Sequence, residues 1–113
     1  MRGFLSLAAC VAVLVLVLFA VSSPAGNPEV GAELAKPCAA CHGSDGIASV
    51  DRYPSLAGQN KGYLYESMKA YRDGNRRGGQ ATVMHGQVAD RTDQELLDLA
   101  AYYASMPRTG KED

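Results

Sequence analysis

Two cysteines and a histidine in one short stretch constrain this chain more than any other feature. Cys38 and Cys41 are separated by two alanines and His42 follows directly, which gives the pattern C-x-x-C-H. This spacing is the attachment signature of a c-type haem. One helical turn presents both sulfurs to the two haem vinyl groups, with which they form thioethers, and directs the imidazole at the iron. We therefore predict one covalently attached haem c, with His42 as the proximal iron ligand.

Three other interpretations of the two thiols remain open. A C-x-x-C pair also occurs in dithiol redox proteins, although these place it in a βαβ context and no convincing strand pattern surrounds Cys38. A disulfide between Cys38 and Cys41 is a second alternative. A tetrahedral zinc site needs two more ligands, and the only other His and Cys residues of the chain are His85 and Cys10. Cys10 lies inside an apolar leader, and we expect it to be an ordinary residue of that leader. The sequence favours haem attachment over all three.

An apolar leader precedes this motif. Residues 4–21 carry no charge, and Ser23 and Ala25 supply small residues of the A-x-A type. We interpret residues 1–25 as a signal peptide. The alternative is an uncleaved membrane anchor, because the apolar run reaches the ~18 residues that a membrane-spanning helix needs. Either outcome exports residues 26–113 and predicts a periplasmic protein, in keeping with haem attachment to thiols in an oxidising compartment.

Size and charge narrow the function classes for residues 26–113. The whole chain has 113 residues and a formal net charge of -1. A nucleic-acid-binding surface needs a clear basic excess, so we predict no nucleic-acid partner. A domain this small buries only a modest fraction of its surface, and a covalently held haem supplies a large apolar disc around which a core can close. We therefore predict a single domain that depends on its cofactor.

Three segments carry helix signals. Asn27 is a good N-cap and is followed by a proline at the first helical position. Leu64, Met68 and Tyr71 share one face of a second helical pattern. Thr92 starts a capping-box sequence at the beginning of the third. The predicted ranges are 28–36, 61–72 and 92–106.

Two segments lack such signals. Residues 49–60 show no sustained periodicity, and we predict an irregular segment on the proximal side of the haem. Residues 75–91 contain three glycines, and we predict a long loop there. A long loop in a small domain is usually functional.

The predicted loop matters because a second axial ligand suits the iron to electron transfer, whereas an open position allows small molecules to bind. Met68, Met84, His85 and Met106 carry suitable donor atoms. Packing accounts for Met68 on a helix face and for Met106 at a helix end. Met84 lies in the glycine-containing loop, and we predict it as the distal iron ligand. His85 is the alternative, and a second imidazole would give the iron a lower reduction potential.

With these motifs in place, the sequence resembles the class I cytochromes c, specifically the small bacterial monohaem proteins and the single domains of dihaem periplasmic cytochromes. The resemblance covers residues 27–107. It implies an all-α fold of three to five short helices wrapped around one covalent haem, with the N- and C-terminal helices crossing. The segments that carry it are Cys38-Ala39-Ala40-Cys41-His42-Gly43, Tyr53-Pro54-Ser55-Leu56-Ala57-Gly58-Gln59, Tyr63-Leu64, Tyr71-Arg72-Asp73-Gly74-Asn75-Arg76, Met84 and Leu99-Ala100-Ala101-Tyr102-Tyr103-Ala104.

The resemblance also implies roles for single residues. Pro54 matches the proline whose backbone carbonyl accepts a hydrogen bond from the axial imidazole, here His42, and so fixes its tautomer and raises its basicity. Gly31 matches the small residue where the first helix crosses the last, near Tyr102. Met84 falls where the family carries its distal ligand. Only one attachment motif is present, so we expect one haem.

These features predict an electron carrier and not an enzyme. The iron would alternate between Fe(II) and Fe(III), no small-molecule substrate would bind, and redox partner proteins would dock transiently. One alternative is a haem subunit of a membrane-associated dehydrogenase or oxidase complex, tethered through residues 4–21. A second is a haem enzyme or gas sensor with an open sixth position.

Two groups of charged residues bear on the choice of partner. A basic cluster would steer an acidic partner, and an acidic group would cover the outer face of the last helix. We favour ordinary solvated charge as the interpretation of both groups. The basic cluster comprises Lys69, Arg72, Arg76 and Arg77, and the acidic group comprises Asp90, Asp93, Glu95 and Asp98.

Overall fold

Helices provide all the regular secondary structure in the part of the chain that the structure describes, residues 25–109 of a computed structural model. The all-α prediction is confirmed. The predictions for residues 4–21 and for Cys10 lie outside the described residues. In chain order the elements are α2 (Pro28–Leu34), the 3-10 turn η1 (Lys36–Cys38), α3 (Ala39–His42), α4 (Lys61–Arg72), α5 (Ala81–Val88) and α6 (Asp93–Ala104).

The first helix begins where its capping signal predicts. The Oδ1 atom of Asn27 accepts hydrogen bonds from the backbone N–H groups of Glu29 (2.9 Å) and Val30 (3.2 Å). The helix ends at Leu34, two residues before the predicted end. Pro37 explains the difference, because a proline disfavours helical backbone at the residue before it and lacks an N–H of its own. The chain tightens into η1 at this point.

The helices α4 and α6 also follow from their sequence signals. The bounds of α4 are those predicted. At the start of α6, Thr92 Oγ1 accepts from the backbone N–H of Glu95 (3.1 Å), and Glu95 Oε1 accepts from the backbone N–H of Thr92 (3.1 Å). This reciprocal pair is the predicted capping box. The helix ends at Ala104, slightly earlier than expected.

The prediction of a long loop over residues 75–91 is wrong, because α5 occupies Ala81–Val88. Its sequence hides the helix: Gln80 makes no side-chain cap hydrogen bond, two glycines precede it and Gly86 lies within it. Tertiary packing supplies what local signals lack. Ala81 and Val88 are buried, and α5 packs against α4. The non-helical parts of this segment are therefore residues 75–80 before α5 and residues 89–91 after it.

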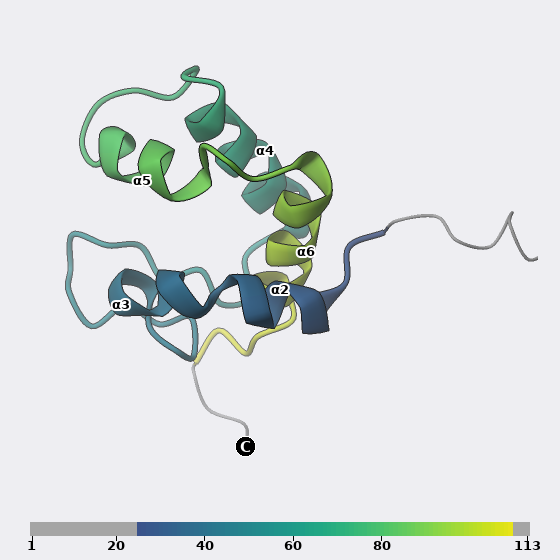
Figure 1. Cartoon of the computed structure of the whole chain (residues 1–113). Coiled ribbons are helices and arrows are strands. Elements are labelled where there is room, and N and C mark those ends of the chain that lie inside the picture. Colours follow the sequence, from purple (N-terminus) through teal and green to yellow (C-terminus); the bar gives the residue numbers. More distant parts are fainter. Residues whose placement is uncertain (1–24, 110–113) are drawn as a thin grey trace, which may run out of the picture.

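Helices α2 and α6 cross at close range, as the resemblance implies (Figure 1). A Cβ atom at Gly31 would lie 2.1 Å from the backbone oxygen of Asp98 and 2.7 Å from the Cβ of Tyr102. Any larger residue would force the two helices apart. Gly31 thus sets the distance between the beginning and the end of the domain.

The same crossing buries Asp98, so its prediction as part of an exposed acidic face is wrong. Only 5% of Asp98 is exposed. Its Oδ1 atom accepts from the backbone N–H of Asn27 (2.8 Å) and from Nε2 of Gln94 (3.0 Å). These hydrogen bonds compensate for the loss of water around the carboxylate. Asp98 therefore fastens the start of α2 to α6.

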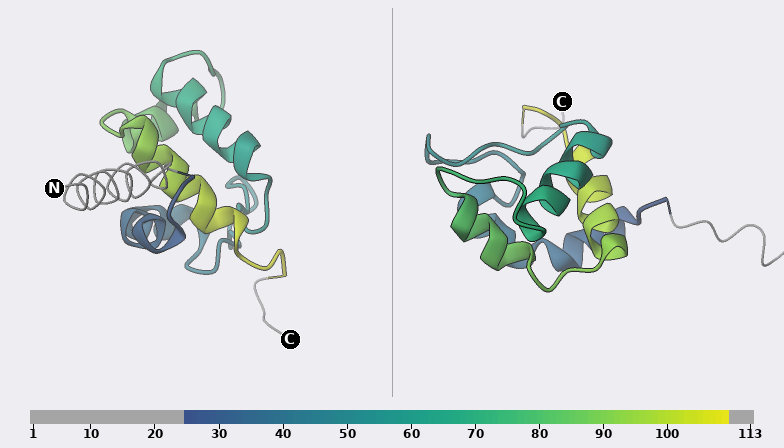
Figure 2. Two further views of the ribbon diagram at one scale, coloured as in Figure 1. Left: turned by 90° about the vertical axis from the view of Figure 1, so that its right-hand side faces the viewer. Right: turned by 90° about the horizontal axis from the view of Figure 1, so that it is seen from above.

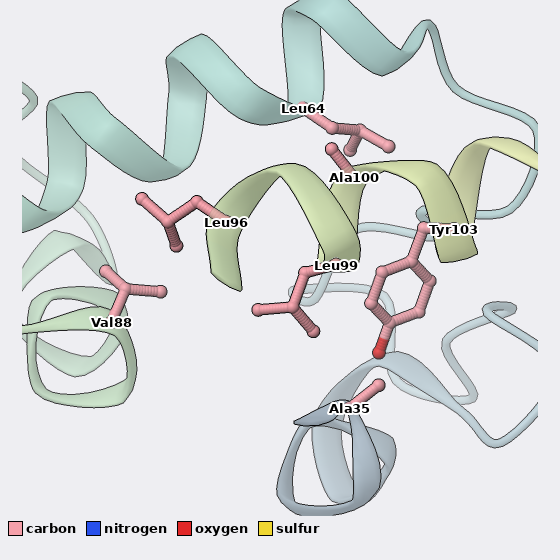
Figure 3. Close-up of a cluster of buried hydrophobic side chains, with 7 residues drawn as sticks. All are labelled: Ala35, Leu64, Val88, Leu96, Leu99, Ala100 and Tyr103. Atoms are coloured by element: carbon pink, nitrogen blue, oxygen red, sulfur yellow. The ribbon is translucent and has the colours of Figure 1, made fainter. Parts of the chain in front are cut away.

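The hydrophobic core is arranged around α6. Leu96 is fully buried, and the core side chains of α6 lie among residues from α4, α5 and the end of α2 (Figure 3). Leu64 of α4 points toward Ala100, and the hydroxyl of Tyr103 points toward Ala35 at the end of α2. The buried residues of this cluster are Ala35, Leu64, Val88, Leu96, Leu99, Ala100 and Tyr103.

Candidate haem-binding site

The two thiols and the histidine lie on one continuous turn of chain. Cys38 ends η1, and Cys41 and His42 end α3. Both cysteines are partly buried free thiols, so the alternative of a disulfide between them is not realised in this structure. His42 is buried, with 6% of its surface exposed. Gly43 follows with φ +84° and stops the helix immediately after the imidazole.

The imidazole of His42 is oriented by the backbone of Pro54. Its Nδ1 atom lies 2.8 Å from the carbonyl oxygen of Pro54. A carbonyl oxygen can only accept, so Nδ1 carries a proton, and in the neutral imidazole this leaves the lone pair on Nε2. This is the hydrogen bond that the resemblance implies. It leaves the unprotonated nitrogen available to a metal ion.

The segment that carries Pro54 is irregular, as predicted, and backbone hydrogen bonds hold it in place. The carbonyl of Gly46 accepts from the N–H groups of Leu56 (2.8 Å) and Ala57 (3.1 Å). The N–H of Gly58 donates to the carbonyl of Tyr103 in α6 (3.0 Å). The Pro54 carbonyl is thus positioned by the hydrogen bonds of the residues that follow it in the chain.

Burial dominates the electrostatics of the first thiol. It raises the pKa of Cys38, while the hydroxyl of Tyr103 and the charge of Arg91 lower that pKa in part. The pKa of Tyr103 is also raised, chiefly by burial and then by the neighbouring Cys38 and Tyr102. Both groups are therefore neutral at pH 7. A neutral thiol in apolar surroundings suits a thioether, which is itself uncharged.

Met84 lies on α5, which is a separate element from the turn that carries the two cysteines and His42. Figure 1 shows α5 above α3, and the view from above in Figure 2 agrees. Met84 is partly buried and packs against the hydrophobic cluster around α6. The thioether of Met84 therefore has an apolar environment.

The other three candidate ligands occupy different surroundings. Met68 of α4 is partly buried against the same cluster. Met106 follows α6 and packs against Gly46, because a Cβ atom added at Gly46 would lie 2.8 Å from the sulfur of Met106. His85 is exposed, and its Nδ1 atom lies 3.0 Å from the backbone oxygen of Tyr71. The ring of His85 is therefore engaged with α4.

The donor set fits a covalently attached haem. Two thiols three positions apart, an imidazole with its lone pair on Nε2 and an apolar cluster with a nearby thioether are the groups that a c-type haem needs. Among residues 25–109, no three His, Cys, Asp or Glu side chains gather into a metal-binding group, so the zinc alternative finds no ligands there.

Comparison with known proteins assigns the family. The family described as Cytochrome c matches residues 29–107. The chain belongs to the cytochrome c family. It is 44% identical over 81 residues to cytochrome c-554(548) of Halomonas halodenitrificans, an alignment that covers 72% of this chain and 98% of that protein.

This cytochrome c also resembles single halves of longer proteins. It is 39% identical over 92 residues to cytochrome c4 of Pseudomonas aeruginosa, covering 81% of this chain and 44% of the relative. The crystal structure of reduced recombinant cytochrome c4 from Pseudomonas stutzeri superposes with a TM-score of 0.65 at 34% identity, covering 74% of this chain and 47% of that one. The chain thus spans about half the length of the cytochromes c4 and nearly all of cytochrome c-554(548).

Membership of the family establishes the cofactor and the general role. The protein is an electron-transfer protein that carries a covalently bound haem c. In residues 25–109 none of the helices combines the length and the apolar character needed to cross a membrane.

Proposed function

We propose that this cytochrome c holds its iron between His42 and Met84 and acts as a periplasmic electron carrier, without enzymatic activity. Cys38 and Cys41 would form the two thioethers. The observation that carries the proposal is the contrast between neighbours on α5: Met84 packs against the apolar cluster, whereas His85 is exposed and engaged with α4. On the other side, Pro54 fixes the tautomer of His42.

The haem, when bound, supplies the reversible Fe(II)/Fe(III) couple. The residues of the chain would set its properties. The hydrogen bond to Pro54 makes His42 a better electron donor. The thioether of Met84 would favour the ferrous state and so raise the reduction potential. Because His42 and Met84 would together hold the iron, no position there would be left for a substrate, and we therefore propose no catalytic reaction.

The periplasmic location rests on the leader. We propose that residues 1–25 are a signal peptide and that residues 26–113 form the cytochrome domain. The mass of the mature polypeptide tests this directly. Loss of about 25 residues is expected, whereas an intact N-terminus would show a retained anchor.

A second candidate function is a haem subunit of an enzyme complex. Relatives of this chain include a protein named cytochrome subunit of sulfide dehydrogenase and one named thiosulfate dehydrogenase electron acceptor. These names favour a role in which this cytochrome c accepts electrons from a dedicated dehydrogenase. Co-purification of a stoichiometric partner from the native host would distinguish a subunit from a free carrier.

Absorption spectroscopy of the protein matured in an export-competent host tests the ligand assignment. The ferric protein should show the weak sulfur-to-iron charge-transfer band in the far red. Met84→Ala should abolish this band, while Met68→Ala and His85→Ala, the matched controls, should keep it. Rapid binding of CO to the unaltered ferrous protein would show an open sixth position and overturn the proposal.

A further inference from the structure

An open hollow of about 460 Å³ lies at the corner between α4 and α5. Tyr71 of α4 forms one wall, Arg76 and Arg77 of the connecting loop form another, and Thr82 and His85 of α5 form a third. Figure 1 shows this connection at the end of the molecule where α5 lies. We call this set of five residues the α4–α5 hollow.

The α4–α5 hollow lies in the most basic part of the chain. Residues 69–89 contain four Lys or Arg and one Asp, a net charge of +3. Because the whole chain has a net charge of -1, all other residues together have a net charge of -4. The segment that lines the hollow is therefore basic, although the chain as a whole is slightly acidic.

The charges in the hollow are not neutralised within the described chain. Arg72, outside the hollow, pairs with Asp73 (2.9 Å) and Asp93 (2.7 Å). By contrast, no carboxylate among residues 25–109 forms an ion pair with Arg76 or Arg77. Two guanidinium groups are therefore available to an external anionic group.

Both guanidinium groups are nevertheless held in position. Arg76 stacks over the ring of Tyr71, with 4.7 Å between its Cζ atom and the ring centroid. Arg77 donates from Nε to the carbonyl of Gly74 (3.3 Å). Arginines held in this way lose less conformational freedom when they bind a carboxylate.

Nothing in the described chain covers the loop beside them. Gly78 and Gly79 have φ values of +89° and +50°, and a Cβ atom at either position would meet no atom within 4 Å. This open surface contrasts with Gly31 and Gly43, where a Cβ would meet backbone atoms at 2.1 Å. The hollow can thus be reached by a partner protein without rearrangement of the loop.

We propose that the α4–α5 hollow is the surface on which an acidic redox protein docks. The proposal rests on the proposed function, and it adds the charge of the partner and the side of approach. Because α5 carries Met84 and forms one wall of the hollow, the partner approaches the iron from the Met84 side. A positive patch of this kind accelerates encounter with an acidic protein, and salt removes the acceleration.

Stopped-flow reduction of the holoprotein by reduced flavodoxin, an acidic one-electron donor, tests the docking surface. One electron passes from the flavin to the ferric iron. Arg76→Gln/Arg77→Gln is compared with Arg52→Gln/Lys61→Gln, a control that removes the same charge from exposed positions outside the hollow. At low salt we expect the rate constant to fall about tenfold in the hollow variant and less than about twofold in the control. At roughly 1 M salt the difference should vanish.

Reduction by the neutral lumiflavin semiquinone, which gives one electron to the ferric iron and becomes oxidised lumiflavin, separates this proposal from the one on which it rests. We expect equal rates in all three proteins, since an uncharged donor does not sense the surface charge. Failure of lumiflavin to reduce the wild-type protein would contradict the proposed function and the docking surface with it. Normal reduction by lumiflavin, together with equal flavodoxin rates in the two variants, would overturn the docking surface alone.

Discussion

The two sides of the proposed haem site are built in different ways. On the attachment side, Cys38, Cys41 and His42 lie within five consecutive residues, and Pro54 reaches the imidazole through a single 2.8 Å hydrogen bond. On the opposite side, Met84 stands on a helix that lacks a side-chain cap and packs against α4. The first side is specified by local sequence and the second by tertiary packing.

This difference indicates which side of the proposed site unfolds locally at the lower free energy. Few polar contacts tie α5 and its flanks to the rest of the fold: His85 meets the Tyr71 carbonyl, and Arg72 donates to the carbonyl of Arg91 (3.1 Å). Segments with few anchoring contacts open at lower free energy than the core. We therefore expect the Met84 side to unfold at a lower denaturant concentration than the attachment side.

The largest effect is expected from the attachment side. Cys38→Ala/Cys41→Ala should abolish covalent haem entirely, because no thioether can form. The mass of the denatured polypeptide measures this directly. Ala40→Ser, an exposed position between the two cysteines, is the control and should keep full attachment. Covalent haem in the double variant would contradict the assignment.

A large effect on stability is expected at the crossing of α2 and α6. The crossing belongs to the attachment side, because α2 directly precedes the turn that carries Cys38. Gly31→Ala places a Cβ 2.1 Å from a backbone oxygen and should cost about 3 kcal/mol of unfolding free energy. Gly62→Ala in α4 meets no atom within 4 Å and should stabilise by about 0.5–1 kcal/mol. Urea unfolding measures both. Similar effects of the two changes would show that the crossing is not close.

A smaller effect is expected on the Met84 side. Val88 is 4% exposed, and Val88→Ala should cost about 2 kcal/mol by leaving a cavity between α5 and α6. Val83 of the same helix is 48% exposed, and Val83→Ala should change stability by less than about 0.5 kcal/mol. The sulfur-to-iron band should disappear at lower urea concentration in Val88→Ala only. Equal sensitivity of the two variants would mean that packing does not hold α5.

The smallest effect concerns pH. The backbone N–H of Thr92, followed by Arg91, holds the pKa of Glu95 below its usual value. A carboxylate with a lowered native pKa stabilises the fold above its unfolded pKa, and the stabilisation is lost as pH falls through the native pKa. Glu95→Gln should therefore lose less stability than wild type between about pH 5 and pH 3, by a few tenths of a kcal/mol. A larger loss in Glu95→Gln would contradict the assigned direction.

Much of the fold could be predicted because its signals are local. The capping residues Asn27 and Thr92 mark two helix starts, and α4 has the predicted bounds. The helix α5 could not be predicted, since its helicity depends on burial of Ala81 and Val88 against neighbours distant in sequence. Local propensity is overridden by packing in such segments.

The same distinction applies to the site. The spacing from Cys38 to His42 defines the attachment turn from sequence alone, and the resemblance pointed to Pro54. The contact of Tyr103 with Cys38 was missed because it joins α6 to η1, and only the position of Tyr103 on the core face of its helix hinted at it. Burial of Asp98 was missed because it arises from the helix crossing.

Urea unfolding of the ferric holoprotein, followed at two wavelengths, tests the difference between the two sides most directly. With the proposed Met84 ligation, the sulfur-to-iron band reports the Met84 side, and far-ultraviolet circular dichroism reports the helices. We predict that the band disappears at a lower urea concentration than the helical signal, with the haem still covalently attached. Coincident loss of both signals would contradict the account, because it would show that the Met84 side is as firmly held as the core.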